Sequence, residues 1–336
     1  MTIKRISIII PLQNDQDLLP DLLQDVLAQE AKPYELLIVD SSDRPVEIDE
    51  GIRKFFSDAN IELRYIYSEP LYPGAARNLG VRQSTGSLIA FLDAKTRPPS
   101  NWLADAFAQV ESAKPMGVLG KTVYAANSRL EKRIRAATYG LNPILTIPGS
   151  LLKREVFSIV GSFIPSIVAG EDTDWMLRTR LHGLNLSPSG PVSLTYTGLL
   201  GIRFTSLLRK WWRNYRASRD VPYLSDHKAI YLFLFNLFVI FVAMHWNAAV
   251  ANWDESSTVY IGHITKLTVG LVVFFYVAYR GFLLPIRRGI SLSYLGPWEW
   301  IFVFGVGLSI DVVKLVAFLP SVQVIARRAR YALFRE

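Results

Sequence analysis

The 336-residue chain contains no cysteine, which excludes disulfides and thiolate metal sites. Its four histidines are scattered along the chain without the spacing of a metal site. No Gly-x-Ser-x-Gly motif occurs, so a nucleophile of the hydrolase type is not expected. The first residues, MTIKRISIIIPLQND, lack the apolar core of a signal peptide, since their apolar run is only five residues long. That run instead predicts a buried strand.

Acidic residues are scarce in the second part of the chain. Residues 1–200 carry 21 Lys/Arg and 22 Asp/Glu, whereas residues 201–336 carry 16 and 7. A basic excess beside long apolar runs favours a membrane surface with anionic lipid over nucleic acid. No nucleic-acid-binding module is recognisable either. We therefore expect membrane lipids among the partners, and no nucleic acid.

Apolar periodicity predicts an α/β domain over residues 1–200. Ile6–Ile10 is a run of β-branched residues broken only by Ser7, as in a central parallel strand that is covered on both faces. The leucines of 18–27 recur at helical spacing, and a second strand follows, which makes a βαβ unit. Together these elements predict an α/β domain with a doubly wound, mostly parallel sheet. The predicted strands cover residues 6–10, 35–39, 61–67 and 88–92.

Acids stand directly after two of these predicted strands. Asp40 ends the second strand, and Asp93 follows strand 88–92. The carboxyl ends of parallel strands form the edge at which open α/β folds bind ligands. Arg77 lies near the start of the predicted helix 75–83, where anions are attracted. A contact between Arg77 and a ligand and a role in capping and packing are both compatible with this pattern.

Three segments in this order resemble the inverting glycosyltransferases of family 2: ISIIIPLQND, YPGAARNLGVRQSTGSLIAFLDAKTRPPSNWL and GEDTDW. The resemblance covers about residues 5–190. It implies the fold called GT-A and the transfer of a sugar from a nucleotide-sugar donor, a UDP-sugar in the first place. It also implies that Asp40 approaches the base or ribose of the donor, and that Asp93, Lys95 and Arg77 lie at the donor.

The family commonly has Asp-x-Asp at the end of this strand, where the two acids hold a divalent cation, Mg²⁺ or Mn²⁺, on the donor diphosphate. Here the triplet is Asp93-Ala94-Lys95. Three interpretations stay open. Asp93 still binds a metal, through one carboxylate and the phosphates; or the Lys95 ammonium supplies the positive charge itself; or Lys95 is exposed to solvent and the site is degenerate.

The acids of the segment GEDTDW carry the second part of the resemblance. It implies that Asp172 is the base that takes the proton of the acceptor hydroxyl, with Glu171 assisting or contacting donor and metal. The same acids also suit an ordinary helix N-terminus, which favours negative charge. Together with the upstream segment, the catalytic interpretation is favoured.

The remainder of the chain is interpreted from its hydropathy. Residues 201–228 contain RFTSLLRKWWRNYRASR, a mixture of basic and aromatic residues that is typical of an amphipathic helix at lipid headgroups. Apolar runs at 229–251 and 264–284 predict two spans of a membrane region, 229–336. Basic residues flank both spans on the same side, and the loop between them has none. The positive-inside rule therefore predicts a multi-pass protein of the inner or plasma membrane with a cytoplasmic catalytic domain.

A third apolar segment, 298–319, carries Asp311 and Lys314 in its middle and precedes a basic tail, Arg327-Arg328-Ala329-Arg330. The segment either crosses the membrane with these charges paired against other helices, or it continues as an in-plane helix beside the catalytic domain. Its length favours crossing.

These observations predict a membrane-anchored glycosyltransferase that acts on a lipid-linked or glycan acceptor in polysaccharide or cell-envelope synthesis. One alternative has polyprenyl phosphate itself as the acceptor. An alternative of another class is a catalytically silent protein of the same fold that binds sugar nucleotides as a scaffold.

Overall fold

The computed structural model describes residues 5–112, 115–184, 186–218, 221 and 228–318. The chain divides into two compact units, of which the first comprises residues 1–131, 141–202 and 217–224. The second comprises residues 132–140, 203–216 and 225–336. The predicted first domain, residues 1–200, is thus interrupted by 132–140, which belongs to the second unit. The predicted basic tail lies outside the described residues.

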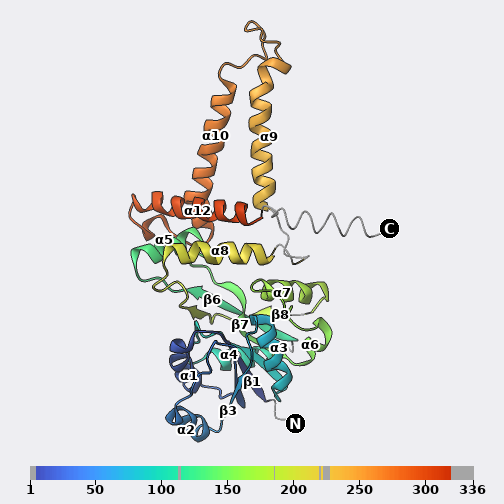
Figure 1. The fold of residues 1–336 in the computed structure, drawn as a ribbon, viewed down its shortest axis with the longest axis vertical. Helices are drawn as coiled ribbons and strands as arrows, with labels where there is room; N and C mark the ends of the chain where they lie inside the picture. Colours follow the sequence, from blue (N-terminus) through green and yellow to red (C-terminus); the bar gives the residue numbers. More distant parts are fainter. Residues whose placement is uncertain (1–4, 113–114, 185, 219–220, 222–227, 319–336) are drawn as a thin grey trace, which may run out of the picture. The chain divides into compact units, whose positions relative to one another are not determined.

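A nine-stranded mixed sheet forms the centre of the first unit, in the order β3-β2-β1-β4-β7-β6-β9-β5, with β8 beside β6 (Figure 1). The first four strands of the chain are parallel to one another, and β7 joins β4 in the antiparallel sense. The α/β fold class and the four predicted strands are confirmed. The strands are β1 (Ile6–Leu12), β2 (Glu35–Asp40), β3 (Glu62–Tyr67), β4 (Leu88–Phe91), β5 (Thr96–Arg97), β6 (Gly117–Tyr124), β7 (Ile144–Lys153), β8 (Leu186–Pro188) and β9 (Leu194–Tyr196).

Helices cover both faces of this sheet. On one face, Ile8 and Ile10 of β1 pack with α1 (Leu19–Leu27) and α4 (Trp102–Ser112). On the other face, Ile9 packs in a second core with residues of α6 and α7. Because successive side chains of β1 enter opposite cores, all of its positions except Ser7 are apolar. The remaining helices of this unit are α2 (Glu50–Asp58), α3 (Pro73–Gln83), α6 (Glu155–Val160) and α7 (Glu171–Leu181).

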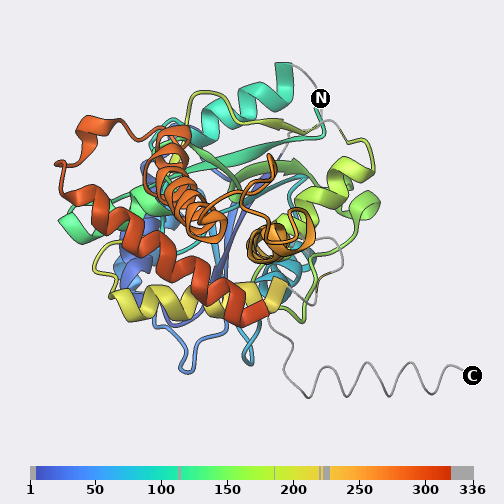
Figure 2. The ribbon, with the colours of Figure 1, turned by 90° about the horizontal axis from the view of Figure 1, so that it is seen from above.

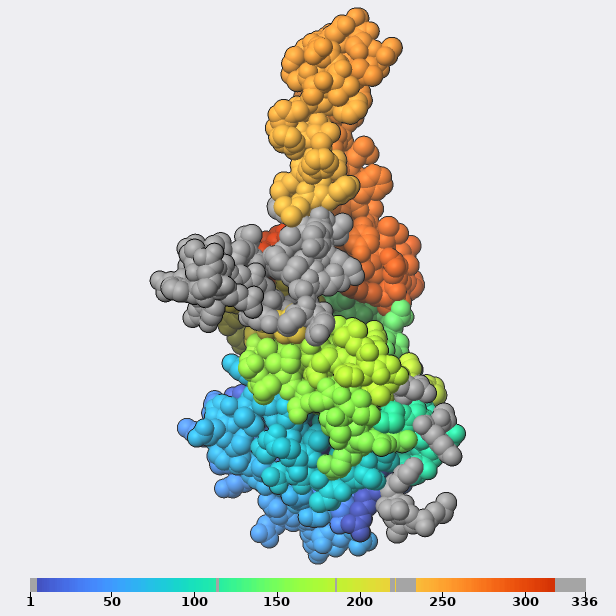
Figure 3. Space-filling view, turned by 90° about the vertical axis from the view of Figure 1, so that its right-hand side faces the viewer, coloured from blue at the N-terminus to red at the C-terminus, as the bar shows by residue number. Residues whose placement is uncertain are grey.

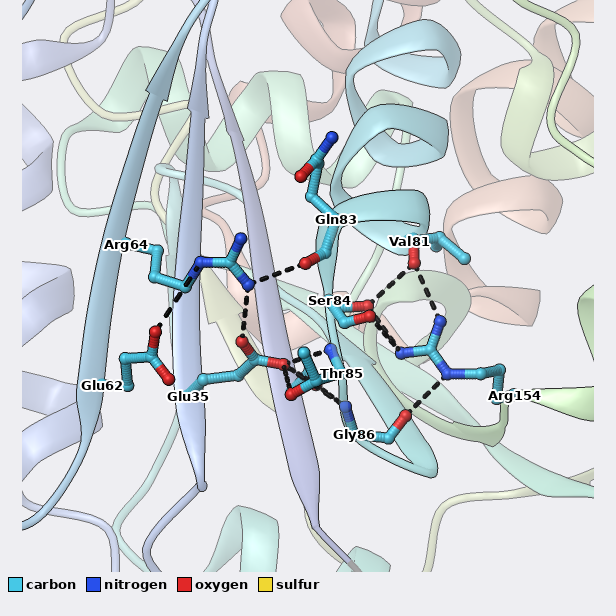
Figure 4. A network of polar contacts seen from close by, with 10 residues as sticks. Glu35, Glu62, Arg64, Val81, Gln83, Ser84, Thr85, Gly86 and Arg154 are labelled. Atoms are coloured by element: carbon cyan, nitrogen blue, oxygen red, sulfur yellow. Dashed lines mark hydrogen bonds and ion pairs between the residues drawn. The ribbon is translucent and has the colours of Figure 1, made fainter.

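A buried carboxylate fixes the amino-terminal edge of the sheet (Figure 4). Glu35, the first residue of β2, accepts hydrogen bonds from the Ser7 hydroxyl, the Thr85 amide and the Arg64 guanidinium at 2.6, 2.6 and 3.0 Å. Burial by itself would raise the pKa of Glu35, but these hydrogen bonds hold it below its ordinary value. The network therefore stabilises the charged form of Glu35.

Substitution of Glu35 tests this network. Because Glu35→Leu leaves several buried donors without an acceptor, we expect the free energy of unfolding to fall by about 2–4 kcal/mol. The folded-state pKa is depressed, so this contribution should be complete above the ordinary pKa of 4.5 and be lost as the pH falls through the folded value. Urea unfolding at pH 7 and at lower pH measures both effects.

Glu62→Leu is the matched control. Glu62 Oε1 lies 3.9 Å from Nε of the same Arg64, yet the Glu62 side chain is more than half exposed. An exposed pair of this kind contributes less than about 1 kcal/mol. Equal losses for the two variants would refute the role of the buried network.

The second unit contains long apolar helices. Among the described residues, two helices are long and apolar enough to cross a membrane, Ile264–Arg287 and Glu299–Ala317, and the apolar helix Leu234–Ala249 is shorter. Helices α9 and α10 form a hairpin (Figure 3). Large apolar side chains are exposed along both helices. The elements of this unit are α8 (Phe204–Ser218), α9 (Lys228–Ala249), α10 (Ile264–Ala278), a π-helix η2 (Tyr279–Leu283), α11 (Leu284–Arg287), a 3₁₀-helix η3 (Leu292–Tyr294) and α12 (Glu299–Phe318), together with the end of α5 (Arg129–Ala137).

The charges in the middle of α12 are paired within this unit. Arg280 of η2 is buried, and its Nε lies 2.7 Å from Asp311 Oδ2. Arg280 Nη1 donates to the Ala137 carbonyl at 2.8 Å. Lys314 Nζ lies 3.7 Å from Asp311 Oδ1 and above the Trp211 ring of α8. Helix α12 accordingly runs beside α8, and it lies crosswise to α10 (Figures 1 and 2). The pairing of Asp311 and Lys314 removes the main obstacle to burying this segment.

We expect Arg280→Leu to destabilise the second unit strongly. The substitution leaves Asp311 among apolar helices without its closest cation, which typically costs about 3–5 kcal/mol. Adding Asp311→Leu should recover much of the loss because the uncompensated charge is then removed. Thermal unfolding of the full-length protein in detergent measures both variants. If the double variant is no more stable than Arg280→Leu alone, the ion pair is not what holds these helices.

Candidate active site

Acidic residues follow three neighbouring strands at one edge of the sheet. Strands β2, β1 and β4 are adjacent and parallel, so their carboxyl ends lie along the same edge. Asp15 comes three residues after β1, Asp40 is the last residue of β2, and Asp93 comes two residues after β4. This is the edge at which α/β sheets bind ligands.

Arg77 connects Asp93 with the acids at the start of α7. It projects from the first half of α3, and its side chain is only 4% exposed. Nη2 lies 3.0 Å from Asp93 Oδ1, and Nη1 lies 2.7 Å from Glu171 Oε1. The prediction that Arg77 and Asp93 share a site with Glu171 is thus consistent with the geometry, although the three residues are far apart in the sequence.

The start of α3 packs closely on the loop that precedes α7. Asn78 donates to the Phe163 carbonyl at 2.8 Å and accepts from the Phe163 amide at 2.9 Å. A Cβ atom on Gly74 would lie 2.5 Å from the Ile164 carbonyl oxygen and 3.3 Å from Glu171 Cβ. Only glycine permits this approach, so the segment Gly74–Asn78 fixes the place from which α7 begins.

Charge is concentrated around Arg77. Burial lowers the pKa of Arg77, but the nearby carboxylates of Asp93, Glu171 and Asp172 raise it above its ordinary value. Burial also raises the pKa of Glu171, against the attraction of Arg77 and with a smaller contribution from the Asp172 charge. Three carboxylates therefore surround one guanidinium, and one of them is pushed towards its neutral form.

The two adjacent acids of α7 differ in their surroundings. Glu171 is 5% exposed and bound to Arg77. Asp172 is partly exposed, and both of its hydrogen bonds, from the Thr173 amide and hydroxyl, go to Oδ1. Among the described residues no donor reaches its Oδ2. Asp172 is therefore the acid of this pair that can accept a proton from a molecule in solution.

Lys95 is held by an ion pair. Its Nζ lies 2.6 Å from Asp15 Oδ1 and 2.5 Å from Asp15 Oδ2, and both side chains are about one-third exposed. The Lys95 carbonyl accepts from the amide and the hydroxyl of Thr197, at 2.8 and 3.0 Å. Lys95 is thus fixed at the sheet edge by its main chain and by its side chain, and it does not project freely into solvent.

Asp40 has no exposed surface, and its carboxylate is already used. It accepts hydrogen bonds from the Ser42 amide at 2.9 Å, the Val46 amide at 3.1 Å and the Tyr65 hydroxyl at 2.6 Å. Burial and Asp40 raise the pKa of Tyr65 to about 12, so Tyr65 stays a donor. The predicted contact between Asp40 and a donor base or ribose would require this buried carboxylate to be uncovered. In this structure Asp40 holds the loop after β2.

That loop in turn supports Asp15. The Ser42 hydroxyl accepts from the Asn14 amide at 2.8 Å, and the Asp43 amide donates to the Asn14 side chain at 3.1 Å. Asn14 adopts a left-handed conformation with φ of 55°, which asparagine tolerates better than most residues. Asp40 therefore acts on the site through the positions of Asn14 and Asp15.

Comparison with known proteins agrees with this architecture. The family model described as "Glycosyl transferase family 2" matches residues 7–169, which include β1, β4 and the residues around Arg77 and Asp93. These residues are a glycosyl transferase family 2 domain. The resemblance predicted from the sequence is confirmed over these residues, and with it the GT-A type of fold, while Glu171 and Asp172 follow just after the matched range.

Two known proteins are similar to this chain in sequence, and one solved structure is similar to it in fold. Glycosyltransferase AglE of Haloferax volcanii is 26% identical over 202 residues, which are 55% of this chain and 64% of AglE. O-antigen biosynthesis protein RfbC of Myxococcus xanthus is 25% identical over 66% of this chain and 20% of its own length. Mannosyltransferase PcManGT from Pyrobaculum calidifontis, solved with GDP-Man and Mn²⁺, aligns over 93% of this chain and 87% of its own, with 16% identity and a TM-score of 0.51. The last likeness is one of fold.

The described side chains at the sheet edge do not form a set of ligands that could hold a metal ion without the donor. Asp93 gives one oxygen to Arg77 and keeps one open, and the third position of its triplet is the Lys95 ammonium. Within the described part of the chain no group of three His, Cys, Asp or Glu side chains is placed to bind a metal. The predicted metal site at Asp93 is therefore not part of a group of three such side chains among the described residues.

The sequence did not lead us to Asp15 or to the two hydrogen bonds between Asn78 and Phe163. Asp15 lies after the first strand, so the rule that singled out Asp40 and Asp93 also applies to it. The contact of Asn78 with Phe163 spans 85 positions. A pairing at that distance leaves no periodic signal in a single sequence.

Proposed function

We propose that the first unit is an inverting glycosyltransferase that moves a sugar from a nucleotide-sugar donor to a hydroxyl acceptor. The observation that carries this proposal is the cluster at the sheet edge, where Arg77 joins Asp93 to Glu171 and the accessible Asp172 lies beside it. The family to which the domain belongs and the glycosyltransferase names of its relatives support the same activity. The chain spans 64% of the length of AglE and 20% of RfbC, so its activity as a whole is part of the proposal.

Asp172, Arg77 and Glu171 have different roles in this reaction. The bond between the anomeric carbon and the diphosphate oxygen breaks, and its electron pair leaves with the nucleoside diphosphate. The acceptor oxygen attacks from the opposite face, which inverts the configuration, and its proton passes to Asp172 Oδ2. Arg77 and the buried Glu171 hold α7 so that Asp172 lies beside the reacting atoms.

We further propose that the second unit anchors the enzyme in the inner or plasma membrane, with the first unit in the cytoplasm. The apolar side chains exposed on α9 and α10 support this, since lipid would cover them. The crosswise course of α12 beside the basic α8 supports the in-plane alternative for 298–319 rather than a third crossing.

A membrane location favours a lipid-linked acceptor in glycan assembly. Polyprenyl phosphate as the acceptor remains a competing form of the proposal, with the basic residues of α8 near its phosphate. The relation to RfbC, named for O-antigen biosynthesis, supports the first form.

A donor screen tests the activity. Purified full-length protein is incubated with membrane lipid extract and a panel of UDP- and GDP-sugars, and products are identified by mass spectrometry. We expect one donor to give a glycosylated lipid and to release its nucleoside diphosphate. Donor binding without release from any member of the panel would instead favour the catalytically silent scaffold.

A further inference from the structure

We propose that Lys95 provides the positive charge that the donor diphosphate needs, and that Asp15 holds the ammonium in place until the donor binds. The site would then bind nucleoside diphosphates without a divalent cation. This inference rests on the proposed function and deepens it, because it concerns how the same site recognises the donor.

The position of Lys95 is the first argument. It occupies the third place of the triplet that begins at Asp93, directly after the central parallel strand β4, at the ligand-binding edge of the sheet. Its main chain is fixed to Thr197 and its ammonium to Asp15, so its charge is positioned before any ligand arrives. A preorganised charge of this kind stabilises a leaving diphosphate without reorganisation.

The state of the ammonium is the second argument. A lysine ammonium has three N–H donors, and the two Asp15 oxygens occupy two of them. One donor stays open on a side chain that is about one-third exposed, so a phosphate oxygen can reach it. A diphosphate, which carries more charge than one carboxylate, competes well with Asp15 for this ammonium.

The surrounding charges give the third argument. Arg77 occupies one Asp93 oxygen, so Asp93 serves as an anchor for a second fixed cation. Two protein cations therefore serve this triplet, Arg77 bound to Asp93 and Lys95 as its third residue.

Nucleotide affinity in the presence and absence of metal tests the inference. Isothermal titration calorimetry on the full-length protein in detergent measures binding of UDP and GDP, and of UMP and GMP, with excess EDTA or with Mn²⁺. We expect the preferred diphosphate to bind equally well, within about twofold, in both buffers. Lys95→Ala should weaken the diphosphate about tenfold or more and leave the monophosphate unchanged, since a charged hydrogen bond is worth that much.

Two further variants separate this role from a purely structural one. Asp15→Asn breaks the same ion pair but keeps the ammonium, so it should bind the diphosphate at least as tightly as the natural protein. If Lys95 only tied two loops together, Asp15→Asn and Lys95→Ala would lose affinity equally. Lys54→Ala, which removes an exposed lysine on α2, serves as the control for general charge.

The outcomes distinguish this inference from the proposed function. Diphosphate binding that requires Mn²⁺, or that survives Lys95→Ala, overturns the role of Lys95 and leaves the glycosyltransferase intact. No binding of any nucleotide in either buffer would overturn both. Unchanged monophosphate affinity in Lys95→Ala shows that the variant site is folded.

Discussion

Asp172→Asn should reduce sugar transfer by about 10²–10⁴-fold while the affinity for donor stays within about twofold. The amide has nearly the same shape as the carboxylate, but it cannot take the proton of the acceptor hydroxyl. Asp172 is partly exposed and its hydrogen bonds are local, so neither the fold nor donor binding depends on its charge. Turnover with the best donor, calorimetric donor affinity and thermal midpoint together measure the effect.

Asp58→Asn provides the matched control, because it removes an exposed carboxylate at the end of α2 in the same unit. It should leave turnover unchanged. If Asp172→Asn retained more than about a tenth of the natural turnover, another group would have to be the base. In that event Glu171→Gln is the next substitution to measure.

The second large effect is expected at Arg77. Arg77→Met removes the only cation that contacts both Asp93 and Glu171 among the described residues, and it leaves Glu171 buried without a partner. Breaking a buried pair in this way typically costs about 3–5 kcal/mol of folding free energy. We expect a matching fall in urea stability and loss of transfer, since α7 would no longer be held at the sheet edge.

A double substitution separates stability from catalysis at this site. Arg77→Met with Glu171→Gln removes the buried charge together with its partner, so much of the stability should return. Transfer should not return, because Asp93 and α7 remain unconnected. Stability losses for Arg77→Met below about 1 kcal/mol would show that the bridge between α3 and α7 is not what organises the site.

The sheet could be predicted from the sequence because its central strands carry a direct signal. Ile6–Ile10 is apolar except at Ser7 since β1 is covered on both faces, and the acids at strand ends mark one edge. The family resemblance, rather than this pattern, predicted that Asp93 and Arg77 lie at one site. The long apolar helices followed from hydropathy, which reports on composition alone.

The partners of individual charges could not be predicted in the same way. Nothing in the sequence indicates that Asp40 accepts hydrogen bonds from two backbone amides and Tyr65, or that Lys95 reaches Asp15 across 80 positions. Residues 132–140 are bound to the other helices of the second unit by Arg280 and Arg288, which both donate to the Ala137 carbonyl. Such contacts depend on three-dimensional proximity and leave no local pattern.

The most direct test of the catalytic role assigned to the sheet-edge acids is a mass balance on a single reaction. Purified natural protein, the donor found in the screen and its lipid acceptor are mixed, and both products are quantified over time. We predict that one nucleoside diphosphate is released for each sugar transferred, and that both products vanish together in Asp172→Asn. Donor that binds to the Arg77 site but is never consumed, with every acceptor in the extract, would contradict it.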